Sequence, residues 1–158
     1  MLVFDASSII YAWDNYPAAQ FLGLWDWIND QIHRNIIQIP SVAFAEVEHP
    51  APECAAWLDA NGISRIPMTN DILLDALRIK KLLGIADDKY GTGVGENDLF
   101  IIATARAHHA VLISDERQQA DLPKNMANYK IPAVCAMKGV HVECINFLEF
   151  IKRSKAVF

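Results

Sequence analysis

Two short apolar runs stand out in the pattern of hydrophobic and polar positions. Residues 1–5 form a run that ends on Asp5, and residues 110–115 form a second run that ends on Asp115. Neither run alternates with polar residues, which is typical of strands buried on both faces in a parallel sheet. If the two strands lie side by side, Asp5 and Asp115 meet at the carboxyl edge of the sheet, where α/β proteins bind their ligands.

The rest of the chain alternates weaker apolar runs with helical periodicity. Further strands are expected at residues 36–39, 63–66 and 140–144, the last at an edge of the sheet. Helices are expected at residues 21–35, 42–49, 53–61, 71–83 and 99–109, with others after Asp5, near residues 130–135 and after Asn146. Alternating strands and helices predict an α/β fold with a mainly parallel central sheet. A length of 158 residues indicates a single domain spanning residues 1–158.

Composition indicates a folded protein outside the membrane. Hydrophobic residues make up 53% of the chain and charged residues 21%, which excludes the disordered class. No apolar run approaches the roughly 20 residues that a membrane helix needs. There is no basic leader and Asp5 interrupts the first apolar run, so we expect no signal peptide and a cytoplasmic location. The three cysteines, Cys54, Cys135 and Cys144, lack CxxC spacing, and we expect reduced, mostly buried thiols.

The formal net charge of −5 argues against a protein that coats nucleic acids through a broad basic face. It does not argue against a nuclease. Acids that bind divalent cations contribute negative formal charge, and the bound metal reverses the local field.

Four acids are expected to converge at the carboxyl edge. Asp5 and Asp115 end strands, Glu46 lies on the helix after the second strand, and Asp98 lies in the first turn of the helix that leads to the Asp115 strand. The glycine-rich loop at residues 85–95 must bring Asp98 back to this edge. Ionised carboxylates this close require a counter-charge, and oxygen ligands without His or Cys favour Mg²⁺ or Mn²⁺.

Taken singly, each acid has a purely structural interpretation. Asp5 can cap a helix, Asp98 can be a first-turn acid placed by the helix dipole, and Glu46 can be a solvated surface residue. Only the combination of the four points to a metal site.

Four neighbours of these acids are candidates for supporting roles: Ser7, Ser114, Glu96 and Glu116. The serine hydroxyls can orient carboxylates or a metal-bound water, or they can simply cap helices. The pattern at residues 91–95, Gly-Thr-Gly-Val-Gly, lacks a preceding strand and a Walker lysine. We therefore interpret it as a loop beside the site and not as a phosphate cradle.

With these residues in place, the sequence resembles the PIN-domain family, which includes the VapC-like toxin ribonucleases. The resemblance lies in residues 2–7, Glu46, residues 96–105 and residues 111–116, while residues 21–27 and 130–135 are similar to a toxin-like subgroup of largely unassigned function. The ordered set of blocks covers nearly the whole chain.

The resemblance implies a Rossmann-like three-layer α/β/α sandwich and an endoribonuclease that depends on Mg²⁺ or Mn²⁺. By position, Asp5, Glu46, Asp98 and Asp115 would form the catalytic, metal-binding quartet. The resemblance also implies an RNA substrate, a cognate antitoxin protein that holds a toxin inactive, and a possible homodimer. Ser7 stands where the family has Asn or Ser, so a hydroxyl group would support the site.

RNA binding would also need local cations despite the acidic chain. Candidate residues are Arg106, His108, His109, Arg117 and Lys124. Binding through phosphates predicts a steep loss of affinity with salt.

Two other interpretations remain open. A phosphate-handling or receiver-like domain would use one acid as phospho-acceptor, but Ser7 stands where a DxD phosphatase needs its second Asp, and residues 140–144 offer no lysine. A catalytically silent PIN-like binding module would have no need to keep all four acids.

Overall fold

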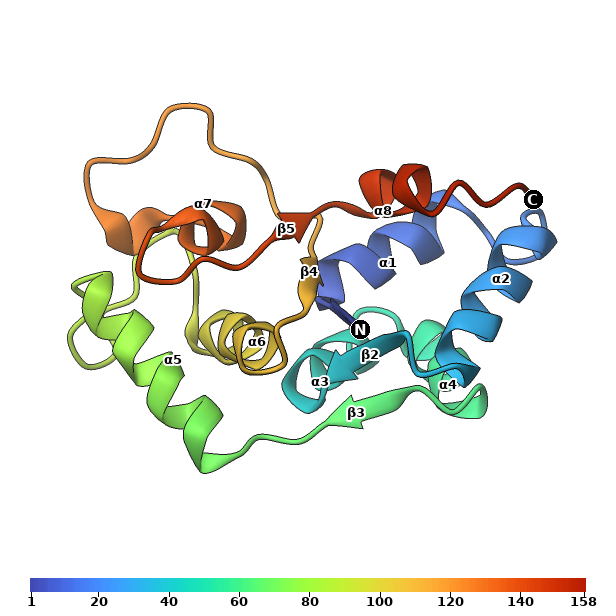
Figure 1. Cartoon of the computed structure of the whole chain (residues 1–158), viewed down its shortest axis with the longest axis horizontal. Helices are drawn as coiled ribbons and strands as arrows, with labels where there is room; N and C mark the ends of the chain where they lie inside the picture. The colour runs from blue at the N-terminus through green and yellow to red at the C-terminus, as the bar shows by residue number, and fades with distance from the viewer.

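The structure, a computed structural model of residues 1–158, is built on one parallel sheet of five strands (Figure 1). The strands are β1 (Leu2–Phe4), β2 (Ile37–Pro40), β3 (Ser64–Ile66), β4 (Val111–Ile113) and β5 (Cys144–Ile145). Their order is β3-β2-β1-β4-β5, and every neighbouring pair is parallel. The predicted mainly parallel α/β architecture is confirmed.

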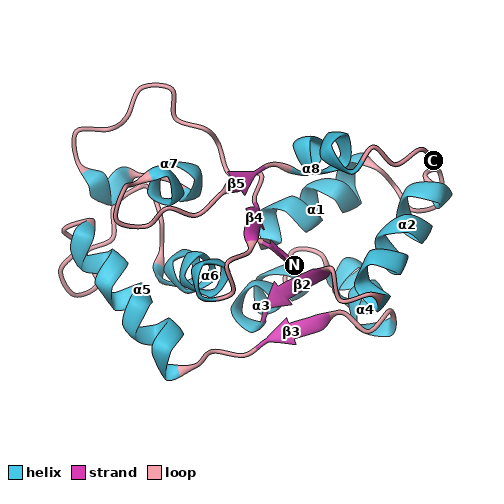
Figure 2. Ribbon diagram, viewed as in Figure 1, coloured by secondary structure: helices cyan, strands magenta, loops and turns pink.

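Eight α-helices flank the sheet (Figure 2). They are α1 (Ala6–Asn15), α2 (Leu22–His33), α3 (Ser41–Glu48), α4 (Pro52–Ala60), α5 (Asn70–Leu82), α6 (Glu96–Ala107), α7 (Ile131–Ala136) and α8 (Phe147–Ser154), with a short 3₁₀ helix at Met126–Asn128. The chain winds outward from β1 to β3 on one side and from β4 to β5 on the other. The switch point of this topology therefore lies between β1 and β4, where such sheets place their ligand sites.

Burial explains why the first apolar run is continuous. Strand β1 is paired on both edges, and Val3 and Phe4 are 0% and 1% exposed. Phe4 lies opposite Ile113 in the register of β1 with β4. Because the two strands end together, the residues that follow them emerge side by side.

Helix starts follow local capping chemistry. The Thr69 hydroxyl accepts the Ile72 backbone N–H at the start of α5, and the Asn146 side chain accepts the Glu149 N–H at the start of α8. Helix α6 begins at Glu96, three residues before the apolar spacing predicts, with Gly95 at its N-cap.

The predicted strand at residues 140–144 is wrong for most of its length. Only Cys144–Ile145 pairs with β4. The Val140 N–H donates to the Met137 carbonyl, and His141 adopts a left-handed φ of 53°, so the chain turns where a strand was expected.

None of the helices combines the length and the apolar character that crossing a membrane requires. All three cysteines are free thiols, with Cys54 and Cys135 buried and Cys144 half-buried.

Candidate active site

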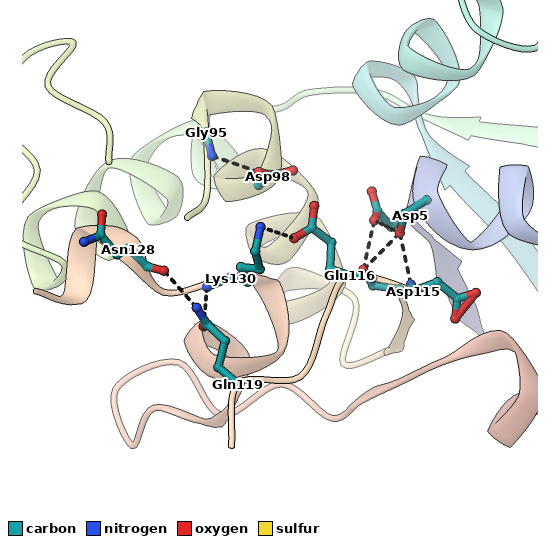
Figure 3. Close-up of polar contacts among 10 residues, drawn as sticks. Asp5, Gly95, Asp98, Asp115, Glu116, Gln119, Asn128 and Lys130 are labelled. Atoms are coloured by element: carbon teal, nitrogen blue, oxygen red, sulfur yellow. Dashed lines mark hydrogen bonds and ion pairs between the residues drawn. The ribbon is translucent and has the colours of Figure 1, made fainter. Parts of the chain in front are cut away.

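The site begins where β1 and β4 end together. Asp5 follows β1, is 3% exposed, and occupies the N-cap position of α1 without capping it through its side chain. Its Oδ2 instead accepts hydrogen bonds from the Ser7 and Ser114 hydroxyls, at 2.5 and 2.9 Å (Figure 3). The Asp5 backbone N–H continues the ladder to the Ile113 carbonyl, at 2.9 Å. A buried carboxylate is thus held in one orientation by a hydroxyl from the first turn of α1 and a hydroxyl that follows β4.

Two more acids reach Asp5 from helices. One carboxylate oxygen each of Asp5, Glu46 on α3 and Asp98 on α6 lie within 4.8 Å of one another. The Asn97 side-chain amide donates to Oε1 of Glu46 at 3.1 Å, and the Gly95 backbone N–H donates to Oδ2 of Asp98 at 2.8 Å. The second oxygens of Glu46 and Asp98 accept no hydrogen bond. The three acids, called here the acid cluster, therefore offer oriented oxygens to a cation.

The acid cluster is electrostatically strained without a cation. Burial, with smaller contributions from the charges of Asp5 and Glu116, raises the pKa of Asp98 to about 6, although the Gly95 N–H and Lys130 act against the rise. Burial also raises the pKa of Asp5 and Glu46, partly offset by their hydrogen bonds. Hard oxygen ligands that resist ionisation until a cation arrives fit a divalent metal such as Mg²⁺ or Mn²⁺.

Asp115 does not join the acid cluster. Its Oδ1 accepts the Phe147 backbone N–H at 2.9 Å, its Oδ2 is buried without a partner, and in Figure 3 the side chain points away from Asp5. Successive side chains of extended backbone point in opposite directions, so Ser114 faces Asp5 and Asp115 does not.

Glu116, the next residue, points toward the acid cluster, whereas Asp115 does not. In Figure 3 it points toward Lys130 and Asp98, and its Oε2 lies 3.9 Å from Nζ of Lys130. Burial raises the pKa of Glu116, with Lys130 acting against the rise and the charges of Asp5 and Glu46 adding to it. Sequence reasoning named Glu116 only as a supporting residue and missed Lys130, whose one signal is its place before a helix start. Glu96, by contrast, is exposed, and its side chain makes no hydrogen bond or ion pair.

The glycine-rich loop lies beside the site, as the sequence predicts. The Val94 N–H donates to the Tyr129 carbonyl at 2.8 Å. A Cβ on Gly93 would overlap that carbonyl oxygen, and one on Gly91 would overlap the Asn128 side chain. The glycines therefore let two loops pack backbone to backbone just before α6, which fixes where α6 begins and so where Asp98 lies.

Three of the five residues predicted to bind RNA lie far from the acid cluster. Arg106, His108 and His109 are at the C-terminal end of α6, whereas Asp98 is in its first turn. A helix of 12 residues is roughly 18 Å long. Arg117 and Lys124 are exposed in the loop after β4.

An all-parallel sheet ordered β3-β2-β1-β4-β5, with acids gathered at the β1–β4 switch point, defines a Rossmann-like α/β fold with a candidate metal site. The chain belongs to the family described as "Domain of unknown function (DUF4411)", whose model matches residues 2–158. No sequence among the curated proteins matches it.

Solved structures support the fold. Eleven chains match, among them the crystal structure of VapBC2 from Rickettsia felis bound to a DNA fragment from their promoter. That match has a TM-score of 0.58 and 16% sequence identity, and it covers 92% of this chain and 98% of the other. VapC toxins are PIN-domain proteins, so the PIN-like three-layer fold implied by the sequence resemblance is confirmed.

Proposed function

We propose that the chain is a metal-dependent endoribonuclease that hydrolyses RNA phosphodiester bonds, with residues 1–158 acting as one nuclease domain. The observation that carries the proposal is the convergence of Asp5, Glu46 and Asp98 within 4.8 Å at the switch point of a PIN-like sheet. Such a cluster has no role in packing the core, and its charges oppose one another.

The three acids would hold the divalent cation, Mg²⁺ or Mn²⁺. When bound, the ion supplies charge stabilisation at the phosphate and lowers the pKa of an attacking water. Ser7 and Ser114 keep the Asp5 carboxylate turned toward this position.

We propose Glu116, and not Asp115, as the fourth acid. It shares the electrostatic field of Asp5, Glu46 and Asp98, whereas the only cluster member whose charge raises the pKa of Asp115 is Asp5. Its half-buried carboxylate can accept a proton from a water beside the cluster.

We further propose that the chain is the toxin of a toxin–antitoxin pair. The support is the fold shared with VapBC2, a complex bound to promoter DNA. A cognate antitoxin would then be the protein partner, and a homodimer is the expected assembly. Co-expression with the protein encoded beside it, followed by light scattering of the purified complex, tests both.

The decisive experiment is RNA cleavage by the purified chain. Single-stranded and hairpin RNAs are incubated with Mg²⁺, Mn²⁺ or EDTA, and Asp98→Asn is compared with wild type. Asparagine keeps an oxygen for the Gly95 N–H but removes the negative charge. We expect cleavage only with metal, and a loss of roughly 1000-fold or more in the variant. Asp71→Asn is the matched control, because Asp71 is an exposed acid in the first turn of α5.

Each other outcome has a definite meaning. Full activity of Asp98→Asn contradicts the assignment of the acid cluster. Metal binding by calorimetry without cleavage of any RNA favours the silent binding module. If the chain neither binds metal nor cleaves RNA, the proposed nuclease function is contradicted.

A further inference from the structure

Lys130 brings a positive charge to the acid cluster from a distant part of the sequence. Its Nζ lies 3.9 Å from Oε2 of Glu116, and the side chain is 30% exposed. At that distance the pair makes no hydrogen bond, and Nζ donates none elsewhere. The three N–H donors of a half-buried ammonium are therefore open to another acceptor.

The backbone that carries Lys130 is held on two sides. Gln119 accepts the Lys130 N–H with Oε1 at 2.8 Å and donates through Nε2 to the Asn128 carbonyl at 3.1 Å (Figure 3). The Asn128 side chain accepts the Thr92 N–H of the glycine-rich loop at 3.0 Å. Lys130 is thus anchored to the loop after β4 and to the loop that leads into Asp98, so its distance from the acids does not depend on a loose surface loop.

Charge balance shows what this lysine adds. Asp5, Glu46, Asp98 and Glu116 carry four negative charges when ionised, and one divalent cation leaves a net charge of −2. A phosphodiester, itself negative, would meet net repulsion there. Lys130 reduces the net charge to −1, and no other basic side chain lowers the pKa of Asp98 or Glu116.

We propose that Lys130 binds a phosphate oxygen of the RNA beside the metal position, and so acts as a substrate-binding residue of the active site. The proposal rests on the nuclease function proposed above. An ammonium with free donors next to an acid cluster suits a phosphate oxygen, because charge-assisted hydrogen bonds are among the strongest in proteins. The competing interpretation is that Lys130 only holds Glu116 in place for the metal.

The test separates RNA binding from metal binding. Affinity for a fluorescein-labelled single-stranded RNA of 20 nucleotides is measured by anisotropy in Ca²⁺ over a range of salt, with the RNA checked on a gel for intactness. Mn²⁺ binding is measured by calorimetry. The variants are Lys130→Ala, Lys130→Arg and the matched control Lys138→Ala, an exposed lysine beyond the other end of α7.

We expect Lys130→Ala to weaken RNA binding about tenfold, and to lower the slope of log affinity against log salt by roughly 0.7, the value for one phosphate contact on a single strand. Lys130→Arg should retain most of the affinity, and Lys138→Ala should match wild type. Mn²⁺ binding by Lys130→Ala should be unchanged or tighter, because a positive charge has left the site.

Two results would overturn the proposal for Lys130 alone. One is RNA affinity and salt slope in Lys130→Ala equal to those of Lys138→Ala. The other is weaker Mn²⁺ binding in Lys130→Ala with an unchanged salt slope, which is the result expected if the lysine only positions Glu116. In both, wild type still cleaves RNA. Failure of wild type to bind or cleave RNA would instead overturn the nuclease function and the lysine proposal together.

Discussion

The two ends of helix α6 differ in how their charged side chains are paired. At its N-terminal end, Asp98 faces two other acids, Asp5 and Glu46, and one carboxylate oxygen of each of the three lies within 4.8 Å of the others. At its C-terminal end, Arg106 meets an opposite charge, Asp75 of α5.

The C-terminal end is electrostatically complete. Arg106 donates through Nη1 to both oxygens of Asp75 at 3.1 Å and through Nε to the Val140 carbonyl at 3.1 Å. Asp75 also pairs with Arg78 at 2.8 Å. These contacts tie α5 and the turn before β5 to the end of α6, and they engage Nε and Nη1 of Arg106 within the protein.

At the N-terminal end the fold brings three acids together, and no basic residue forms an ion pair with them. Like charges facing one another lower stability, and nothing in the core requires them there. A sequence that is locally consistent almost everywhere breaks its own rules at functional sites. The contrast along one helix therefore distinguishes charges that hold the structure from charges that await a ligand.

Apart from substitutions in the acid cluster, the largest expected effect on RNA cleavage comes from substituting Glu116, the proposed fourth acid. Glu116→Gln should slow RNA cleavage roughly 10- to 100-fold, the usual cost of losing a group beside the metal ligands, whereas Asp115→Asn should leave the rate within about twofold. Cleavage rates at saturating Mn²⁺ compare the two. The reverse order would return the role to Asp115.

A smaller effect is expected at the paired end. Arg106→Ala should lower the free energy of unfolding by about 1 to 2 kcal/mol, because one ion pair and one hydrogen bond to a carbonyl are lost together. Its RNA cleavage at 25 °C should match wild type. The control is Arg34→Ala, which removes a single exposed ion pair with Asp30 and should cost less than about 0.5 kcal/mol. Chemical denaturation measures both, and loss of cleavage in folded Arg106→Ala would show that the two ends are not separate.

Much of the fold is predictable because its signals are local. The apolar runs around Val3 and Leu112 indicate buried parallel strands, and the helices expected at residues 71–83 and after Asn146 are found as α5 and α8. Once strands alternate with helices, the parallel sheet follows from chain geometry, and with it the meeting of the ends of β1 and β4 at one edge. The sequence predicts that Asp5 and Asp115 meet there, whereas in the structure Ser114 contacts Asp5 and Asp115 binds the Phe147 N–H.

What the sequence did not show depends on side-chain direction and on packing between distant segments. Asp115 and Glu116 are adjacent in the sequence, and the path of the backbone after β4 decides which of the two side chains points toward the acid cluster. Lys130 reaches the site because hydrogen bonds between Gln119 and the backbone of Asn128 and Lys130 hold its loop in place. No sequence pattern predicts these contacts. Residues 140–143 alternate like a strand, but Val140 ends a turn and residues 141–143 form no regular secondary structure.

The smallest expected effect sharpens the comparison most, because it measures the strain at the N-terminal end directly. Without metal, the pKa of Asp98 is about 6 in the folded chain against an ordinary value of 3.8, so the folded state binds the proton more tightly and loses stability as the pH rises from about 4 to 6. The amide that Asp98→Asn introduces does not ionise, so the variant escapes this loss. In EDTA at pH 7.5, Asp98→Asn should therefore melt about 3 °C above wild type, and the gain should fade at pH 4.5. Asp71→Asn, the exposed control, should show no gain. A gain that is equal at both pH values would assign the change to packing and not to charge. Added Mn²⁺ should reverse the order, because it binds and stabilises the wild-type cluster more strongly than the variant.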